Sequence, residues 1–153
     1  MVSPYPAIRM CPCRAALYAV FLLVVLLIPA SAEVWIEGSP GGEATSFIDF
    51  FDELRQSHER VVIDGPCYSA CTLVLAIVPR SRICVTPRAV FGFHAARAVD
   101  QYGREYPAPE ATRAVGAAYP APIRKWINRH GGLTRKPIFL AGRELARIIP
   151  RCR

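Results

Sequence analysis

Four short runs of β-branched and aromatic residues, separated by two helical patterns and a turn, constrain the fold of this chain most strongly. The runs cover residues 34–36, 61–63, 83–85 and 89–93, and the helical patterns cover residues 43–56 and 70–78. Each run has the composition of a short buried strand. Strands that alternate with helices are typical of a layered α/β domain with a mainly parallel sheet. We therefore predict one such domain over residues 33–153.

The first 32 residues have the pattern of a secretion signal. Arg9 and Arg14 precede an uncharged apolar run over residues 15–28, and Ala30-Ser31-Ala32 fits a small-residue cleavage site. The apolar run is shorter than the about 20 residues that a membrane-spanning helix needs. We therefore expect a cleaved signal peptide over residues 1–32 and a periplasmic or secreted protein. An inner-membrane anchor is the alternative, and a membrane is a partner only if the signal is not cleaved.

The charge of the chain argues against a nucleic-acid partner. The formal net charge is +7, but the arginines after the signal are scattered from Arg55 to Arg153 rather than clustered with aromatic residues. A nucleic-acid-binding surface needs a basic patch or stripe, so we expect no nucleic-acid partner. The sequence also contains neither a P-loop nor a dinucleotide-binding motif.

Four cysteines follow the predicted signal: Cys67, Cys71, Cys84 and Cys152. An even number in an exported protein indicates disulfides, and four cysteines allow three complete pairings. A bond between Cys67 and Cys71 would pin the segment between them, and Cys71 with Cys84 is the competing neighbour pair. The spacing lacks the paired Cys-x-x-Cys and neighbouring histidines of a zinc site, so we expect no metal.

Ser69 lies at the turn between the strand over residues 61–63 and the helix over residues 70–78. The turn places its hydroxyl beside the free N–H groups and the positive dipole end of the helix. A serine nucleophile needs such a place, because a neighbouring N–H can hold the oxyanion formed during acyl transfer. Serine is also a common helix cap, and the turn alone favours that simpler role.

Two further features favour a nucleophile. Gly41 and Gly42 follow the strand over residues 34–36, where glycine lets the backbone approach a ligand and point its N–H groups at it. His94 ends the last strand-like run, so it lies at the edge of a sheet. His58 and His130 each end a predicted helix, where a favourable charge or a cap is the simpler role.

The order and spacing of Gly42, Ser69 and His94 resemble those of the Clp protease proteolytic subunit and the wider Clp/crotonase superfamily. The resemblance covers residues 34–145, and Gly-x-Cys-x-Ser-Ala-Cys followed by Gly-Phe-His looks closest to an exported, periplasmic branch. It implies that Ser69 is the nucleophile, that His94 is the general base and that the N–H groups of Gly42 and Ala70 form the oxyanion hole. It further implies hydrolysis of a peptide or protein substrate without a cofactor, and a homo-oligomer.

Two departures from the family pattern leave other functions open. The acidic residue that orients the histidine in the family falls at Pro137, so the third triad member is unknown, and the opening β/α unit of the family is missing. The first hypothesis is an exported serine peptidase with a weak Ser69–His94 dyad. The second is an inactive binding module of the same fold in the cell envelope. The third, a serine–lysine peptidase with Lys125 or Lys136 as base, lacks the register that such a base requires.

Residues 95–109 contain turn residues without a clear period, which indicates a flap over the site. The acidic residues that could replace the missing triad member are Asp100, Glu105, Glu110 and Glu144. Asp100 is close enough in sequence to return to His94 if the flap folds back tightly. We expect instead that no acidic residue assists His94.

Overall fold

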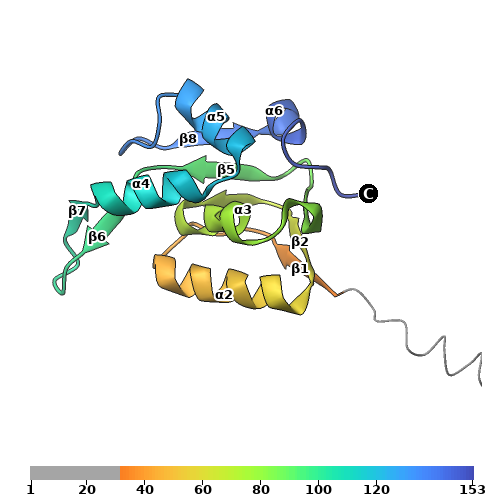
Figure 1. The fold of residues 1–153 in the computed structure, drawn as a ribbon, viewed down its shortest axis with the longest axis horizontal. Helices are drawn as coiled ribbons and strands as arrows, with labels where there is room; N and C mark the ends of the chain where they lie inside the picture. Colours follow the sequence, from red (N-terminus) through yellow and green to blue (C-terminus); the bar gives the residue numbers. More distant parts are fainter. Residues whose placement is uncertain (1–31) are drawn as a thin grey trace, which may run out of the picture. The chain divides into compact units, whose positions relative to one another are not determined.

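The computed structural model describes residues 32–153, so the predicted signal peptide lies outside the described residues apart from its last residue. Within residues 32–153, no helix has both the length and the apolar character that a membrane span requires. Figure 1 shows the helices α2 (Ala44–Ser57) and α5 (Ala121–Arg129) on opposite sides of the strands. The predicted alternation of strands and helices is therefore present as layers.

The strands form two small sheets rather than one (Figure 1). The first sheet contains β1 (Glu33–Ile36), β2 (Arg60–Ile63) and β4 (Ile83–Val85), which are parallel and ordered β1-β2-β4. The second sheet contains β3 (Pro66–Tyr68), β5 (Val90–Phe93) and β8 (Ile138–Ala141), ordered β3-β5-β8. β3 runs parallel to β5, and β8 runs antiparallel to it. The fold is thus α/β with mainly parallel pairing, as predicted.

Each strand of the first sheet continues towards the second sheet after a short break. The breaks are residues 37–38 after β1, residues 64–65 after β2 and residues 86–89 after β4. Beyond the first break, Ser39 bridges to β3: its N–H donates to the carbonyl of Pro66 (2.7 Å), and its carbonyl accepts from the N–H of Tyr68 (3.0 Å). Three chain segments therefore reach the second sheet side by side and in the same direction.

The breaks are held together by one close crossing and one ion pair. A Cβ atom on Gly65 would lie 1.9 Å from the carbonyl oxygen of Glu37, so only glycine fits where these segments cross. The largely buried carboxylate of Asp64 accepts hydrogen bonds from Arg88 and from the hydroxyl of Thr86 (2.6 Å). These hydrogen bonds hold the pKa of Asp64 below its usual range, and the bond from Arg88 has the largest effect. The carboxylate therefore stays charged and links two of the breaks.

Helix α2 packs one face onto the core. Phe51 and Leu54 on this face are buried, whereas Phe50 is exposed. Glu43 caps the first turn, and its carboxylate oxygens accept the N–H groups of the second and third helical residues. His58 ends the helix in the left-handed conformation, with φ of 63°, as its predicted position at the helix end allows.

The remaining helices are shorter than the sequence patterns. The pattern over residues 70–78 begins as a 3-10 helix, η1 (Ser69–Leu73), and continues as α3 (Val74–Ile77). The pattern ending near His130 consists of α4 (Pro109–Ala118) and α5, which are separated at Pro120 because proline cannot continue a helix. The last helix is α6 (Gly142–Ala146).

Residues 95–109, predicted as a flap, contain a regular hairpin. β6 (Arg97–Val99) pairs antiparallel with β7 (Glu105–Pro107). The carboxylate of Asp100 closes the turn by accepting the N–H groups of Tyr102 and Arg104, each at 2.9 Å. Figure 1 shows this hairpin at the N-terminal end of α4, where it extends away from the sheets.

Two disulfides select one of the three pairings that the sequence allowed. Cys67 bonds Cys71, which is one of the two neighbour pairs that the sequence left open, and Cys84 bonds Cys152. The alternative pair of Cys71 with Cys84 is not formed. The second disulfide joins residues 68 positions apart and attaches the C-terminus to β4.

Candidate active site

Ser69 directly follows β3 and opens η1, at the predicted strand-to-helix turn. Its φ is 53°, in the left-handed region that residues other than glycine seldom occupy. Such a conformation costs about 1–3 kcal/mol and persists only where the surroundings enforce it. The residue is partly exposed.

The first restraint on this turn is covalent and steric. The Cys67–Cys71 disulfide spans Ser69 and ties β3 to η1. On the opposite side lies Gly41, whose own φ is 88°. A Cβ atom on Gly41 would lie 2.5 Å from Cβ of Ser69 and 2.6 Å from the carbonyl oxygen of Tyr68. The glycine loop therefore lies directly against the turn.

The second restraint is a chain of hydrogen bonds that sequence reasoning missed. The hydroxyl of Thr72 donates to the carbonyl of Ser69 at 2.6 Å. Because its only hydrogen is used there, it accepts from the hydroxyl of Tyr119, also at 2.6 Å. Burial raises the pKa of Tyr119 to about 12, so the phenol keeps its proton at neutral pH. Nothing in the local sequence indicates this chain, since Tyr119 comes from the end of α4.

His94 directly follows β5, the neighbour of β3 in the second sheet. Because Tyr68 pairs with Gly92 in parallel register, Ser69 and His94 both lie at the carboxyl ends of adjacent strands. Nδ1 of His94 lies 2.7 Å from the carbonyl oxygen of Ala95. A carbonyl only accepts, so this bond places the ring hydrogen on Nδ1 and leaves Nε2 unprotonated in the neutral ring.

The structure brings Ser69 and His94 to one edge, but within residues 32–153 no hydrogen bond joins their side chains. Catalytic hydrogen bonds are often long without substrate and tighten when it binds. The two side chains therefore lie at one edge of the sheet without a direct hydrogen bond.

The two segments that meet at this turn carry backbone N–H groups without a hydrogen-bond partner among the described residues. The N–H of Gly41 donates to the hydroxyl of Ser39 at 3.2 Å. The next N–H, that of Gly42, has no such partner among the described residues. Ala70 is the second residue of η1, and N–H groups of a first helical turn have no partner within the helix. The predicted donors, Gly42 and Ala70, are therefore uncommitted groups on the two segments that meet at Ser69.

Pro137, at the position where the family pattern has its acidic residue, directly precedes β8 as His94 directly follows β5. β5 and β8 pair antiparallel with Phe93 opposite Ile138, so the next pair in register is His94 and Pro137. The chain stays close beyond this point, since the N–H of Ala95 donates to the carbonyl of Thr134 at 2.8 Å. No carboxylate can reach the imidazole from Pro137.

None of the four acidic substitutes contacts His94. Asp100 accepts hydrogen bonds within its own hairpin, and the backbone bond from Arg104 is the first cause that lowers the pKa of Asp100. Glu105 pairs with Arg97, Glu110 pairs with Arg113, and Glu144 lies on α6. Asp100 therefore does not return to the histidine.

The other candidate groups lie apart from this arrangement. Lys125 is exposed on α5 and Lys136 is exposed before β8, and neither side chain has a hydrogen bond or ion pair within residues 32–153. His130 stacks on Trp126, and its Nδ1 donates to the carbonyl of Trp126 at 2.8 Å. It therefore serves the end of α5, as predicted. Among residues 32–153, no cluster of three or more His, Cys, Asp or Glu could hold a metal.

Solved structures share this fold, although no protein-family model and no curated protein sequence matches the chain. One is a serine-to-alanine mutant of the 1510-N membrane-bound stomatin-specific protease. It has a TM-score of 0.56 and 16% identity over 92% of this chain and 73% of that chain. Another is a mutant of ClpP1 from Listeria monocytogenes, with a TM-score of 0.48 and 16% identity over 92% of this chain and 86% of that chain. Identity this low establishes the fold alone, and the predicted Clp protease-like fold is confirmed.

Proposed function

We propose that this protein is an exported serine hydrolase that cleaves peptide-type acyl bonds with Ser69 and His94. The observation that carries the proposal is the left-handed backbone of Ser69. A disulfide, a glycine contact and a buried hydrogen-bond chain all support this conformation. Strained positions of this kind cluster at catalytic sites, because the strain fixes a reactive group where chemistry needs it.

The proposed reaction uses each group in turn. Nε2 of His94 takes the proton of the Ser69 hydroxyl, and the oxygen attacks the substrate carbonyl. The N–H groups of Gly42 and Ala70 hold the oxyanion. His94 then gives its proton to the leaving amine. A water molecule, deprotonated by His94, attacks the acyl group, and His94 returns that proton to the oxygen of Ser69 as the acid is released.

The carbonyl of Ala95 performs one of the two roles of a triad carboxylate, since it orients the imidazole but does not balance its charge. By accepting from Nδ1 it holds the ring in the tautomer that leaves Nε2 free. A neutral carbonyl stabilises the imidazolium less than a carboxylate does, because it carries no full negative charge. The proposed dyad is therefore slower than a complete triad.

A catalytically inactive binding module of the same fold is the second candidate. The observation that favours it is Pro137, which replaces a carboxylate with a side chain that can neither orient nor charge-balance His94. Such a module would use the edge at Ser69 and His94 to hold a peptide without cleaving it.

Export and self-association are also part of the proposal. Disulfides form and persist in oxidising compartments, so the two disulfides support a periplasmic or secreted chain. Within residues 32–153, β1 pairs only with β2. Trp35 in β1 lies where a further unit would cover it, and this residue is 52% exposed. A second copy of the chain is the partner that we propose for this surface.

Labelling with a fluorophosphonate probe tests the function. We expect mass spectrometry to find the probe on Ser69 of the wild-type protein and no labelling of the Ser69→Ala variant, because only an activated serine attacks the probe. If the folded wild-type protein stays unlabelled, the binding module replaces the hydrolase as the better account.

Restoring the acidic position tests the site plan. We expect Pro137→Asp to raise the turnover of an activated peptide ester about tenfold, because a carboxylate beside His94 stabilises the imidazolium. Pro137→Asn is the matched control, since it removes the proline and adds no charge. A folded Pro137→Asp variant that is no faster than Pro137→Asn would show that position 137 does not serve His94.

A further inference from the structure

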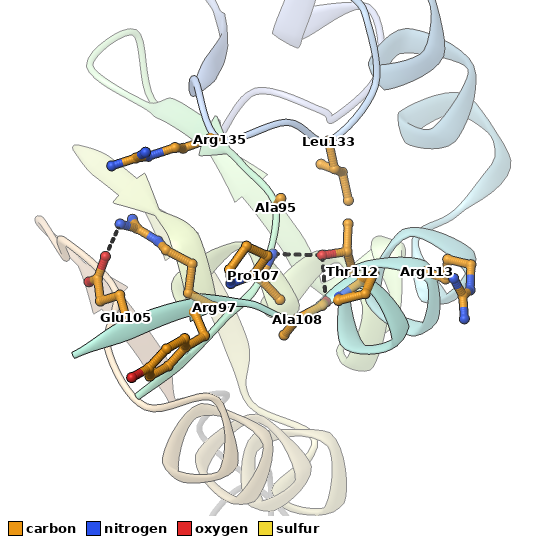
Figure 2. Close-up of a pocket in the computed structure, with 12 residues that line it drawn as sticks. Ala95, Arg97, Glu105, Pro107, Ala108, Thr112, Arg113, Leu133 and Arg135 are labelled. Carbon is orange, nitrogen blue, oxygen red and sulfur yellow. Dashed lines mark hydrogen bonds and ion pairs between the residues drawn. The ribbon is translucent and has the colours of Figure 1, made fainter. Parts of the chain in front are cut away.

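A cleft of about 480 Å³ begins at the residues that follow His94. Ala95 and Ala96 form one part of its wall, and the β6–β7 hairpin, the start of α4 and the loop before β8 form the rest (Figure 2). Thr112 fixes two of these walls to each other: its hydroxyl accepts the N–H of Ala96 at 3.0 Å and donates to the carbonyl of Ala108 at 2.9 Å. The cleft is therefore built into the fold and opens beside the proposed base.

The charged side chains of the cleft are mostly basic. Arg97, Arg113 and Arg135 line it, together with one acid, Glu105. Glu105 pairs with Arg97, and Arg113 pairs at 3.5 Å with Glu110, which does not line the cleft. Arg135 forms no ion pair with any residue in the described part of the chain. The cleft therefore holds an uncompensated guanidinium.

Figure 2 shows where Arg135 lies relative to the other charged residues of the cleft. Arg135 lies on the same side as the Arg97–Glu105 pair, and Arg113 lies on the opposite side. Leu133, Pro107 and Ala108 supply apolar surface between the two sides. Arg135 is exposed, and its guanidinium extends outward at the rim of the cleft, away from these apolar residues. A guanidinium at the rim of a cleft with apolar walls suits a carboxylate at the end of an aliphatic segment, because its N–H groups bind both carboxylate oxygens at once.

The direction of the proposed reaction indicates which part of a substrate reaches this cleft. The base of an acyl-transfer site donates its proton to the leaving amine, so the leaving segment departs on the side of His94. We propose that the cleft binds the leaving segment of a peptide substrate through a carboxylate that pairs with Arg135. The orientation rests on the proposed function, whereas the carboxylate preference rests on the cleft alone. An acidic side chain and a free peptide C-terminus present the same carboxylate chemistry.

Peptide binding to the Ser69→Ala variant tests this preference without hydrolysis. Four fluorescein-labelled peptides of alanine and leucine would end in two glutamates or two glutamines, each with a free or an amidated C-terminus. By fluorescence anisotropy at low ionic strength, we expect carboxylate-bearing peptides to bind about three- to fivefold more tightly than the amidated glutamine peptide. The difference should shrink as salt screens the charges. A preference that follows glutamate identifies side chains as the source, and one that follows the free terminus identifies the C-terminus.

A second substitution in the same background locates the binding group. Arg135→Gln should abolish the preference for a carboxylate. Arg80→Gln, which removes the same charge from an exposed residue in η2 (Arg80–Arg82) before β4, should keep it. Equal binding of all four peptides, or a preference that survives Arg135→Gln, would overturn the proposal. Labelling of wild-type Ser69 by the fluorophosphonate does not depend on the cleft, so a failure of the cleft and a failure of the hydrolase are distinguishable.

Discussion

Replacing His94 with alanine should slow the fluorophosphonate labelling of Ser69 by about two to four orders of magnitude, without unfolding the protein. The serine hydroxyl is a weak nucleophile at neutral pH until a base takes its proton. His94 lies at the carboxyl end of the strand next to the serine, with its Nε2 left unprotonated by the bond to Ala95. The measurement is the rate of probe incorporation, and circular dichroism monitors the fold.

The other two histidines provide the controls. His58 ends α2 and His130 stacks on Trp126, so neither belongs to the proposed reaction. We expect His58→Ala and His130→Ala to be labelled at the wild-type rate. Equal labelling of His94→Ala and the wild type would show that the histidine is not the base.

Replacing Gly65 with alanine should destabilise the fold by about 3 kcal/mol or more, which is a large part of a typical domain's stability. The added Cβ would lie 1.9 Å from the carbonyl oxygen of Glu37. The oxygen is a backbone atom, and Cβ is bonded directly to the backbone. Neither can rotate away, so the breaks after β1 and β2 would have to separate. Urea denaturation of the oxidised protein measures this loss as a lower midpoint.

Gly38 is the matched control, because it belongs to the same crossing. A Cβ atom on Gly38 would meet only Cδ of Pro66, at an ordinary 3.8 Å, and its φ is not in the left-handed region. We expect Gly38→Ala to leave the midpoint unchanged or to raise it slightly, since alanine restricts the unfolded chain. Similar midpoints for Gly65→Ala and Gly38→Ala would show that the two segments do not cross this closely.

Hydrophobic pattern predicted β1, β2, β4, β5 and α2, but it predicted neither β3 and β8 nor the division of the strands between two sheets. The predicted strands end at residues 36 and 63, and the close contact at Gly65, beyond these ends, involves residues distant in sequence. The β6–β7 hairpin was missed for another reason. All six of its strand residues are exposed, so they show no alternation between a buried and an open face.

The candidate site was predictable only where its residues mark the ends of local elements. Ser69 and His94 follow strands directly, and Gly41 and Gly42 form a recognisable turn, so their convergence at one edge could be expected. The bond between Thr72 and Tyr119 joins residues 47 positions apart, and neither residue type is unusual at its position. The choice among disulfide pairings likewise depends on where the C-terminus lies.

The two outer edges of the first sheet differ, and this difference limits how the sheet can grow. Along β4 the C-terminus occupies the edge: the N–H of Val85 donates to the carbonyl of Pro150, the N–H of Cys152 donates to the carbonyl of Val85, and the disulfide locks Cys152 there. Within residues 32–153, β1 is the strand of this first sheet whose outer edge has no partner strand. An unpaired edge is a template for further strands, but a sheet with a single open edge can be extended only once. Backbone pairing between copies through the first sheet would therefore stop at a dimer instead of propagating into a fibre.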